Sequence, residues 1–441
     1  MAIPAAREQS GNRYAWYVVF VLMLAYTLSF IDRQILSLLV QPIKAELQIS
    51  DTQVGLLQGF AFALFYTVLG LPMGRLVDRY NRRNLIAAGV FLWSLMTAAA
   101  GGARSFGSLF AARMGVGVGE ATLSPAALSL ITDYFRRSRL ATALSIYSLG
   151  IFIGAGTAFM VGGALAGALA GRPDVSLPVL GDVAAWRLIF FIVGAPGLLL
   201  ALVVGRLREP ERTGSLLAHD GSARRLSIAA VMAEVRKRWR PVTAVTLGMA
   251  CHAICMYGVF AWMPTFFIRS YAWSPAQAGL AVGACVLICG CAGMALGGHL
   301  CDRWRAAGMR HAVMRIGVLG AALAGIGVVA ATSVSAAPLA VALLAPAIFG
   351  LALPIGSMFA ALQLIFPNQI RGQVSALFLC VISLVGISLG PLLPGLLNDR
   401  LFGGGVGIGP ALAVTVGCGA LAMATVCRAG YAPFTRALDS D

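Results

Sequence analysis

Four charged residues lie inside segments that are long and apolar enough to span a lipid bilayer. Arg113 and Glu120 lie in one of these segments, and Asp32 and Arg33 lie in the first. A charge in hydrocarbon costs at least about 3 kcal/mol on insertion scales, so residues of this kind by default mark a binding site or an ion pathway. Two carboxylates and two guanidinium groups are suited to exchanging protons and to binding an anion.

The spacing of these residues predicts which side chains meet. Arg113 and Glu120 are seven positions apart, so they project from one face of a helix, roughly 10 Å apart along its axis. Asp32 and Arg33 are adjacent and point about 100° apart, so they are not each other's partners. We expect Arg113 to bridge Asp32 and Glu120 around a water-filled cavity, where an anionic cargo would release a carboxylate to take up a proton. The alternative is an ion pair that only holds the two helices together.

The composition excludes a soluble globular protein. The 441 residues are 59% hydrophobic and 11% charged, with a mean hydropathy of +0.85, whereas about a quarter of a soluble domain is charged. The apolar residues come in blocks of membrane-spanning length. We predict an all-α membrane protein with twelve transmembrane helices, at residues 15–40, 54–74, 85–103, 108–132, 141–168, 187–206, 241–268, 276–298, 312–332, 338–362, 374–397 and 407–427.

The basic residues predict the orientation. Of the 33 Lys and Arg residues, 25 fall on the two tails and the even-numbered connections, and six fall on the other connections. This asymmetry places both termini in the cytoplasm. Arg113 and Asp32 then lie in the outer half of the membrane, with Glu120 nearer its middle. Because the positive charge serves topology, we expect no nucleic-acid partner.

The connection between Arg206 and Arg240 divides the spans into six plus six. We predict an N-terminal bundle at residues 1–206, a cytoplasmic linker at 207–240 and a C-terminal bundle at 241–441. Within the linker, residues 224–239 have the pattern of a basic amphipathic helix on the membrane surface. The two halves also repeat short motifs, since the loop from Gly74 to Arg79 matches the loop from Gly298 to Arg303. Such duplicated halves are typical of transporters whose site lies at the midplane between them.

The segment from Gly74 to Arg83 resembles the signature loop between helices 2 and 3 of the major facilitator superfamily. The resemblance implies a cytoplasmic latch, in which Gly74 permits close helix contact and Asp78 meets the N-terminus of span 11. The alternative is that these charges only set the topology. The predicted gate residues are Gly74, Asp78, Arg79, Arg83, Arg139, Asp302, Arg303 and Arg371.

Further motifs resemble the spinster-like branch of that superfamily, in a bacterial-type member, which implies a multi-pass protein of a bacterial inner (plasma) membrane. They stand at residues 30–36, 43–47, 50–53, 117–126, 367–373 and 398–403. This resemblance implies that Asp32 and Glu120 couple transport to protons and that Arg113 and Arg33 are substrate or switch residues. The anion:cation symporters for sugar acids and other carboxylates, which pair an Asp-Arg in helix 1 with an Arg and a Glu in helix 4, are the rival branch.

The second half carries no formal charge inside a predicted span. Its candidate cavity residues, which ordinary helix packing would explain equally well, are His252, Tyr257, Trp262, Met358, Phe359 and Gln363. The nine cysteines are interpreted as small hydrophobic residues without a metal site. The glycines of helix 5 favour close packing over a role in antiport.

Together these features predict a secondary active transporter. We expect it to work by alternating access as a monomer among membrane lipids, to use the proton gradient and to need no cofactor. Its cargo would be a small organic anion or a lysolipid-like amphiphile. Motifs of hydrolases, nucleotide-binding loops and zinc enzymes are absent, so we expect no enzyme activity. A receptor or membrane enzyme that transports nothing is disfavoured because a static scaffold needs no paired latch loops.

Overall fold

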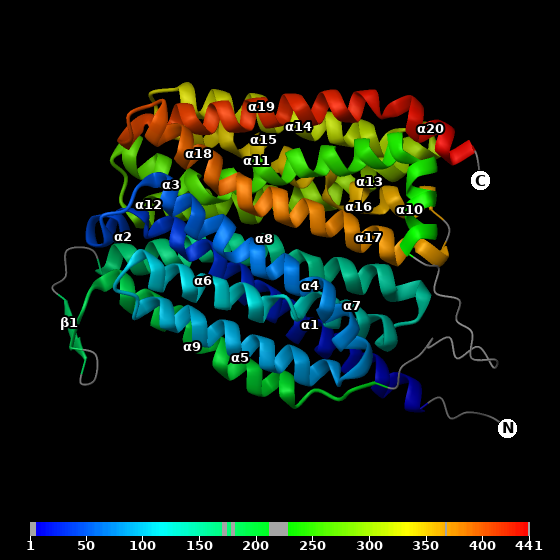
Figure 1. The fold of residues 1–441 in the computed structure, drawn as a ribbon, viewed down its shortest axis with the longest axis horizontal. Helices are drawn as coiled ribbons and strands as arrows, with labels where there is room; N and C mark the ends of the chain where they lie inside the picture. The colour runs from blue at the N-terminus through cyan, green and yellow to red at the C-terminus, as the bar shows by residue number, and fades with distance from the viewer. Residues whose placement is uncertain (1–5, 170–173, 178–180, 211–227, 367, 440–441) are drawn as a thin grey trace.

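The computed structural model describes residues 6–169, 174–177, 181–210, 228–366 and 368–439. Within this part, twelve helical units are long and apolar enough to cross a membrane, which confirms the twelve predicted spans. They form two bundles side by side, one from each half of the chain (Figure 1). The start of α1 and all of α20 lie at one end, here named the α20 end, and α2 and β1 lie at the other, here named the α2 end (Figure 1).

The first bundle follows the first six predicted spans, although some spans contain two or three segments. Its elements are α1 (Ala6–Gln34), η1 (Ile35–Leu38), α2 (Val40–Leu47), α3 (Asp51–Gly55), η2 (Leu56–Phe60), α4 (Ala61–Arg79), α5 (Arg82–Gly101), α6 (Phe106–Glu120), α7 (Leu123–Tyr134), α8 (Arg137–Leu169), β1 (Val175–Leu177), β2 (Gly181–Val183) and α9 (Ala185–Gly205). The two short strands pair antiparallel, with Val175 opposite Val183. This hairpin is an addition to the predicted all-α fold.

The second bundle repeats this organisation after α10 (Ile228–Lys237), which covers part of the predicted amphipathic linker helix. Its elements are α11 (Trp239–Tyr271), α12 (Pro275–Cys285), η3 (Val286–Gly290), α13 (Cys291–Ala306), α14 (Ala312–Ser333), α15 (Ala337–Ala352), α16 (Pro354–Ile365), α17 (Asn368–Ile382), η4 (Ser383–Ile387), α18 (Ser388–Arg400), η5 (Gly405–Gly407), α19 (Ile408–Ala429) and α20 (Tyr431–Asp439). The π-helical turns η2 and η3 interrupt spans 2 and 8, which are equivalent spans of the two halves. This match agrees with the predicted duplication.

The fourth span breaks directly after Glu120, which is the last residue of α6. The next helix contains Pro125 in its first turn. Proline lacks an N–H, and its ring collides with the carbonyl four residues earlier, here that of Ala121, in a continuous helix. The break therefore leaves the Glu120 carboxylate at the negative end of a helix dipole, where a cationic partner is needed to stabilise it.

Glycines bring the two bundles into backbone contact at the α2 end. A Cβ built on Gly163 of α8 would lie 2.5 Å from the carbonyl oxygen of Pro275, the first residue of α12. A Cβ on Gly55 of α3 would lie 2.6 Å from the carbonyl oxygen of Pro391, in α18. Such distances exclude any side chain larger than hydrogen. The packing interpretation of the helix 5 glycines is confirmed, and the two halves are closed against each other at this end.

The signature-loop glycines at the α20 end have a different environment. A Cβ built on Gly74 or on the equivalent Gly298 meets no atom within 4 Å in the described structure. The close helix contact predicted at Gly74 is therefore absent among the described residues in this conformation, and it stays a prediction for the conformation that the latch would hold. The physical reason is that the seam between the bundles is closed at the opposite end, so the helices carrying these glycines are not pressed together here.

Candidate functional site

Glu120 is held by one face of α1. Its side chain is 1% exposed, and its Oε2 accepts hydrogen bonds from Ser29 Oγ at 2.5 Å and from Arg33 Nε at 2.7 Å. Arg33 Nη2 completes an ion pair with the same oxygen. Ser29 and Arg33 lie four residues apart, so they project from the same face of the helix. The other carboxylate oxygen, Oε1, is buried without a hydrogen-bond partner, which leaves it available to a proton or a donor.

Arg113 does not bridge the two carboxylates, so that prediction is wrong. Its Nε donates to the carbonyl oxygen of Leu57 at 3.3 Å, and its Nη1 donates to the backbone carbonyl oxygen of Asp32 at 3.1 Å. The physical reason is that α1 ends at Gln34 and η2 is a π-helical turn, and both features leave backbone carbonyls without their usual helical partners. Arg113 satisfies those carbonyls. Its Nη2 remains buried without a partner.

Asp32 lies on a different face of α1 from Arg33, as predicted. It is buried, and Glu120 and Arg113 are the charges that act on its carboxylate. Thr97 and Trp93 of α5 turn their donors toward this carboxylate, but neither Thr97 Oγ1 nor Trp93 Nε1 completes a hydrogen bond of good geometry. Asp32 is therefore less tightly held than Glu120, with donors and one cation in reach.

Aromatic rings surround the guanidinium of Arg33. Its Cζ lies 4.2 Å from the ring centroid of Phe62, 4.9 Å from that of Phe30 and 5.0 Å from that of Tyr66. These contacts help to offset the desolvation of a buried cation. Tyr257 of the second bundle lies close enough to the Arg33 guanidinium for the two groups to act on each other electrostatically. The charged cluster thus faces the other half of the protein.

Three of the remaining cavity candidates of the second bundle have packing roles. His252 Nε2 lies 2.5 Å from the carbonyl oxygen of Leu351, and Trp262 Nε1 donates to the carbonyl oxygen of Pro391 at 2.7 Å. Met358 is fully buried. These contacts are ordinary helix packing, which the sequence left open as the alternative. The side chains of Phe359 and Gln363 lie outside the described residues.

The predicted gate residues are only partly described. Arg83 Nη1 donates to the carbonyl oxygen of Leu207 at 2.6 Å. Arg79, Arg139, Asp302 and Arg303 are exposed, and the side chains of Asp78 and Arg371 lie outside the described residues. The latch therefore stays a prediction.

Sequence reasoning missed Arg82 as a structural anchor. This arginine is almost fully buried, pairs with Asp133, and donates to Glu209 Oε1 at 2.7 Å. It therefore joins α5 to α7 and to the residues that follow α9.

Sequence reasoning also missed a network that joins the two bundles at the α2 end. Asp51 is 0% exposed, and its carboxylate accepts from Arg269 Nη1 at 2.6 Å and Nη2 at 2.8 Å. Asn398 Nδ2 donates to the same carboxylate at 2.5 Å, and Lys44 pairs with it from α2. One buried carboxylate thus gathers donors from both halves.

A second carboxylate crosses the seam in the opposite direction. Asp399 of α18 accepts from the backbone N and the hydroxyl of Thr52, both at 2.6 Å. Its charge faces the N-terminus of α3, where a negative group is favoured. We name Lys44, Asp51, Thr52, Arg269, Asn398 and Asp399 the Asp51 lock.

The chain is similar to known proteins over nearly its whole length. Residues 22–391 match the family described as Major Facilitator Superfamily. An "MFS-type efflux pump" of Mycolicibacterium smegmatis is 30% identical over 407 residues, which cover 89% of this chain and 87% of that protein. A "Probable L-galactonate transporter" of Escherichia coli is 28% identical over 309 residues, covering 67% of this chain and 63% of that protein.

A crystal structure gives a similar comparison in three dimensions. A bacterial homologue of the human lysosomal transporter Spinster, in an inward-facing and unoccupied conformation, superposes with a TM-score of 0.76 at 29% identity. The superposition covers 97% of each chain. The predicted resemblance to the spinster-like branch is therefore confirmed.

Proposed function

Since this chain belongs to the Major Facilitator Superfamily, we propose that it couples the transport of an organic anion or an anionic amphiphile to protons. The observation that carries the proposal is the buried ion pair of Glu120 with Arg33, next to Asp32 and Arg113. Two buried acids and two buried bases are costly in a membrane, and a packed bundle does not require them. In this proposal the protein works as a monomer in the inner membrane, and its α20 end faces the cytoplasm.

The mechanism begins with competition for a guanidinium. In the described conformation, Ser29 and Arg33 hold Glu120 as a carboxylate. An anionic cargo that enters beside Tyr257 competes with the Glu120 carboxylate for the guanidinium of Arg33. When the cargo binds, Arg33 pairs with the cargo. Glu120 then lacks a counter-charge in a low-dielectric site and takes up a proton. The unpartnered Nη2 of Arg113 offers Asp32 or the cargo one further donor.

Alternating access follows from the two ends of the seam. The Asp51 lock and the glycine contacts close the α2 end. In the proposal, cargo therefore reaches the charged cluster from the α20 end in this conformation. Transport then requires the lock to open while the signature loops come together around Gly74 and Gly298. The inward-facing conformation of the Spinster homologue supports this assignment.

The surroundings of the charged cluster favour a cargo with an apolar part. Rings of Phe30, Phe62 and Tyr66 cover Arg33, and Tyr26 stacks on Tyr147 at a centroid distance of 4.8 Å. A sugar acid needs several amide and hydroxyl partners instead. An amphiphile with one anionic group is therefore our first candidate. The similarity to the L-galactonate transporter makes a sugar acid the second.

The Asp32→Asn variant tests proton coupling. In the proposal Asp32 passes on the proton that Glu120 takes up, and an asparagine cannot accept or release that proton, so we expect accumulation driven by a pH gradient to fall at least about tenfold. Exchange of cargo at equal pH should remain, because exchange needs no net proton movement. The measurement is uptake into proteoliposomes, with L-galactonate and a lysophospholipid as cargo. Glu234→Gln, a change in α10 far from the cluster, is the control, and unaltered accumulation by Asp32→Asn would contradict the proposal.

The Gly74→Val variant tests the movement at the α20 end. The new side chain has free space in this conformation, so we expect thermal stability to stay within about 0.5 kcal/mol of the wild type. The valine should destabilise the conformation that is closed at the α20 end by about 1–3 kcal/mol, because its side chain would collide with the opposite loop. The transport rate should therefore fall roughly tenfold or more. The matched change Gly163→Val should instead lower thermal stability. Wild-type transport by Gly74→Val would show that the signature loops do not approach each other.

A further inference from the structure

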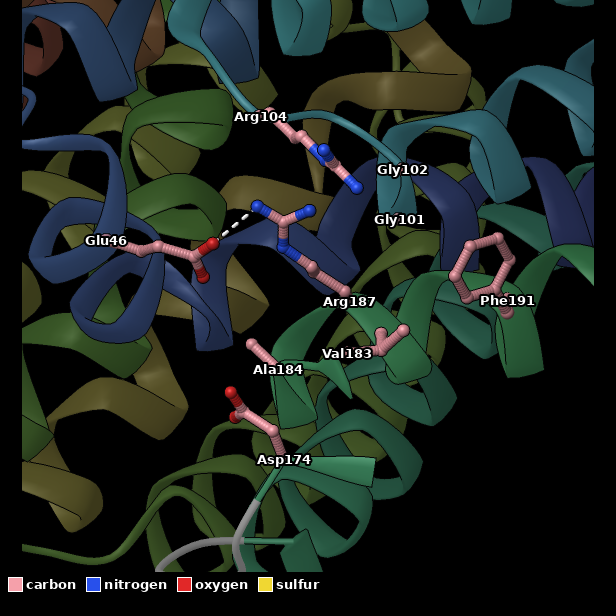
Figure 2. A pocket seen from close by; sticks show the side chains of 9 residues that line it. All are labelled: Glu46, Gly101, Gly102, Arg104, Asp174, Val183, Ala184, Arg187 and Phe191. Atoms are coloured by element: carbon pink, nitrogen blue, oxygen red, sulfur yellow. Dashed lines mark hydrogen bonds and ion pairs between the residues drawn. The ribbon is translucent and has the colours of Figure 1, made fainter. Parts of the chain in front are cut away.

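A pocket opens at the α2 end of the first bundle, away from the charged cluster. It has a volume of about 470 Å³ and forms where the three α2-end connections of this bundle meet (Figure 2). Its lining residues are Glu46, Gly101, Gly102, Arg104, Asp174, Val183, Ala184, Arg187 and Phe191. Neither the transport mechanism nor the Asp51 lock uses this pocket.

Two arginines share one wall of the pocket, and among the described residues Glu46 is the only lining carboxylate that pairs with either of them. Arg187 Nη2 pairs with Glu46 Oε1, and Trp186 Nε1 donates to Glu46 Oε2. Both oxygens of Glu46 are therefore engaged. Figure 2 shows the guanidinium of Arg104 directed toward that of Arg187. The Arg187 side chain is only 13% exposed, whereas Arg104 is exposed and its guanidinium can turn toward a ligand.

Two further features of the pocket suit an oxyanion. The 21-residue helix α9 begins at this wall, and its N-cap residue, Ala184, provides no side-chain hydrogen bond to the first turn. The positive end of the helix dipole therefore adds to the two guanidinium groups. Asp174 lines the same pocket and carries its carboxylate at another part of the rim (Figure 2). It disfavours a second negative group, so the ligand should carry one oxyanion.

The helices below the pocket present apolar side chains at the edge of the bundle. Leu95 of α5 and Ile192 of α9 are exposed within about two helical turns of the pocket, so acyl chains of the adjacent leaflet can lie against them. We propose that the pocket is an oxyanion site that binds a phosphate group, carried by a phospholipid of the adjacent leaflet or free in solution.

Phosphate binding by purified protein tests the site. Delipidated protein in detergent is titrated with inorganic phosphate at constant ionic strength, with chloride as the reference, and the Tm is followed. We expect a saturable rise in Tm with phosphate, and an affinity at least about tenfold weaker in Arg104→Gln, because a charge-assisted hydrogen bond is lost. Arg400→Gln removes the same charge from an exposed position of α18 outside the pocket and should bind phosphate as the wild type does. Equal affinity in Arg104→Gln and the wild type, or no saturable effect of phosphate, would overturn the proposal.

Native mass spectrometry after incubation with phosphatidylglycerol distinguishes the two sources of phosphate. Loss of one bound lipid in Arg104→Gln, but not in Arg400→Gln, assigns the site to a lipid headgroup. An unchanged lipid count together with weaker phosphate binding assigns it to a free anion. Neither arm depends on transport, so failure of the proposed function leaves this test intact.

Discussion

Replacing Glu120 with glutamine is expected to lower the free energy of unfolding by about 3–5 kcal/mol, because it leaves the buried Arg33 without a counter-charge. The glutamine keeps the size of the side chain and a hydrogen-bond acceptor for Ser29, so the loss comes from charge and not from packing. We also expect proton-driven accumulation to disappear. Thermal unfolding in detergent measures the first effect, and proteoliposome uptake measures the second.

A double variant separates stability from coupling. Arg33→Gln with Glu120→Gln removes both charges, so it should recover most of the stability lost in the single variant. It should not recover proton-driven accumulation, because neither the proton acceptor nor the cation is present. If Glu120→Gln alone were as stable as the wild type, the ion pair between α1 and α6 would contribute nothing to the free energy of unfolding.

Replacing Asp51 with asparagine is expected to open the α2 end. Arg269 and Lys44 would then face each other in a buried site without their shared carboxylate. Breaking a buried pair costs about 3 kcal/mol or more, which shifts the balance between closed and open conformations by about a hundredfold. The conformation open at the α2 end relieves this cost by exposing the cations to water.

Hydrogen exchange followed by mass spectrometry measures that opening without labels. Amides of α3 and of the last turn of α18 should exchange faster in Asp51→Asn than in the wild type, because both segments meet across the lock. Amides in the middle of α5 and α9 provide an internal reference, because these two helices pack against each other within one bundle. Glu234→Gln serves as the control variant. Unchanged exchange in α3 would mean that the lock does not hold the two halves together.

The membrane architecture is predictable from the sequence because its signals are local. Each span is a block of apolar residues, and the basic residues between spans predict on which side each connection lies. The depth of Glu120 also follows from its place in its span. The break after Glu120 depends on Pro125, a residue whose effect on helices is likewise local.

The partner of each charge was not predictable in the same way. Arg113 turns to Leu57 and to the backbone of Asp32 because a π-helical turn and a helix end leave carbonyls unpaired there, and side-chain spacing does not reveal such turns. The clamp on Glu120 was visible in principle, since Ser29 and Arg33 stand four residues apart on one helix face. That spacing was the overlooked signal.

The Asp51 lock joins residues that are far apart in the chain. Asp51 meets Arg269 and Asn398, 218 and 347 residues away. Contacts between residues so far apart in the chain cannot be predicted from a single sequence. The available hint was that Lys44 and Arg269 are among the six basic residues on the connections where positive charge is otherwise rare.

The most direct test of the central claim is the number of protons taken up when cargo binds. Saturating cargo is added to weakly buffered protein in detergent, and the pH change is recorded between about pH 5 and pH 8, the range in which linkage between cargo and proton can be followed. The account predicts uptake of about one proton per cargo bound by the wild type, and none by the Arg33→Gln, Glu120→Gln double variant. Cargo binding by the wild type with no proton uptake anywhere in this range would contradict it.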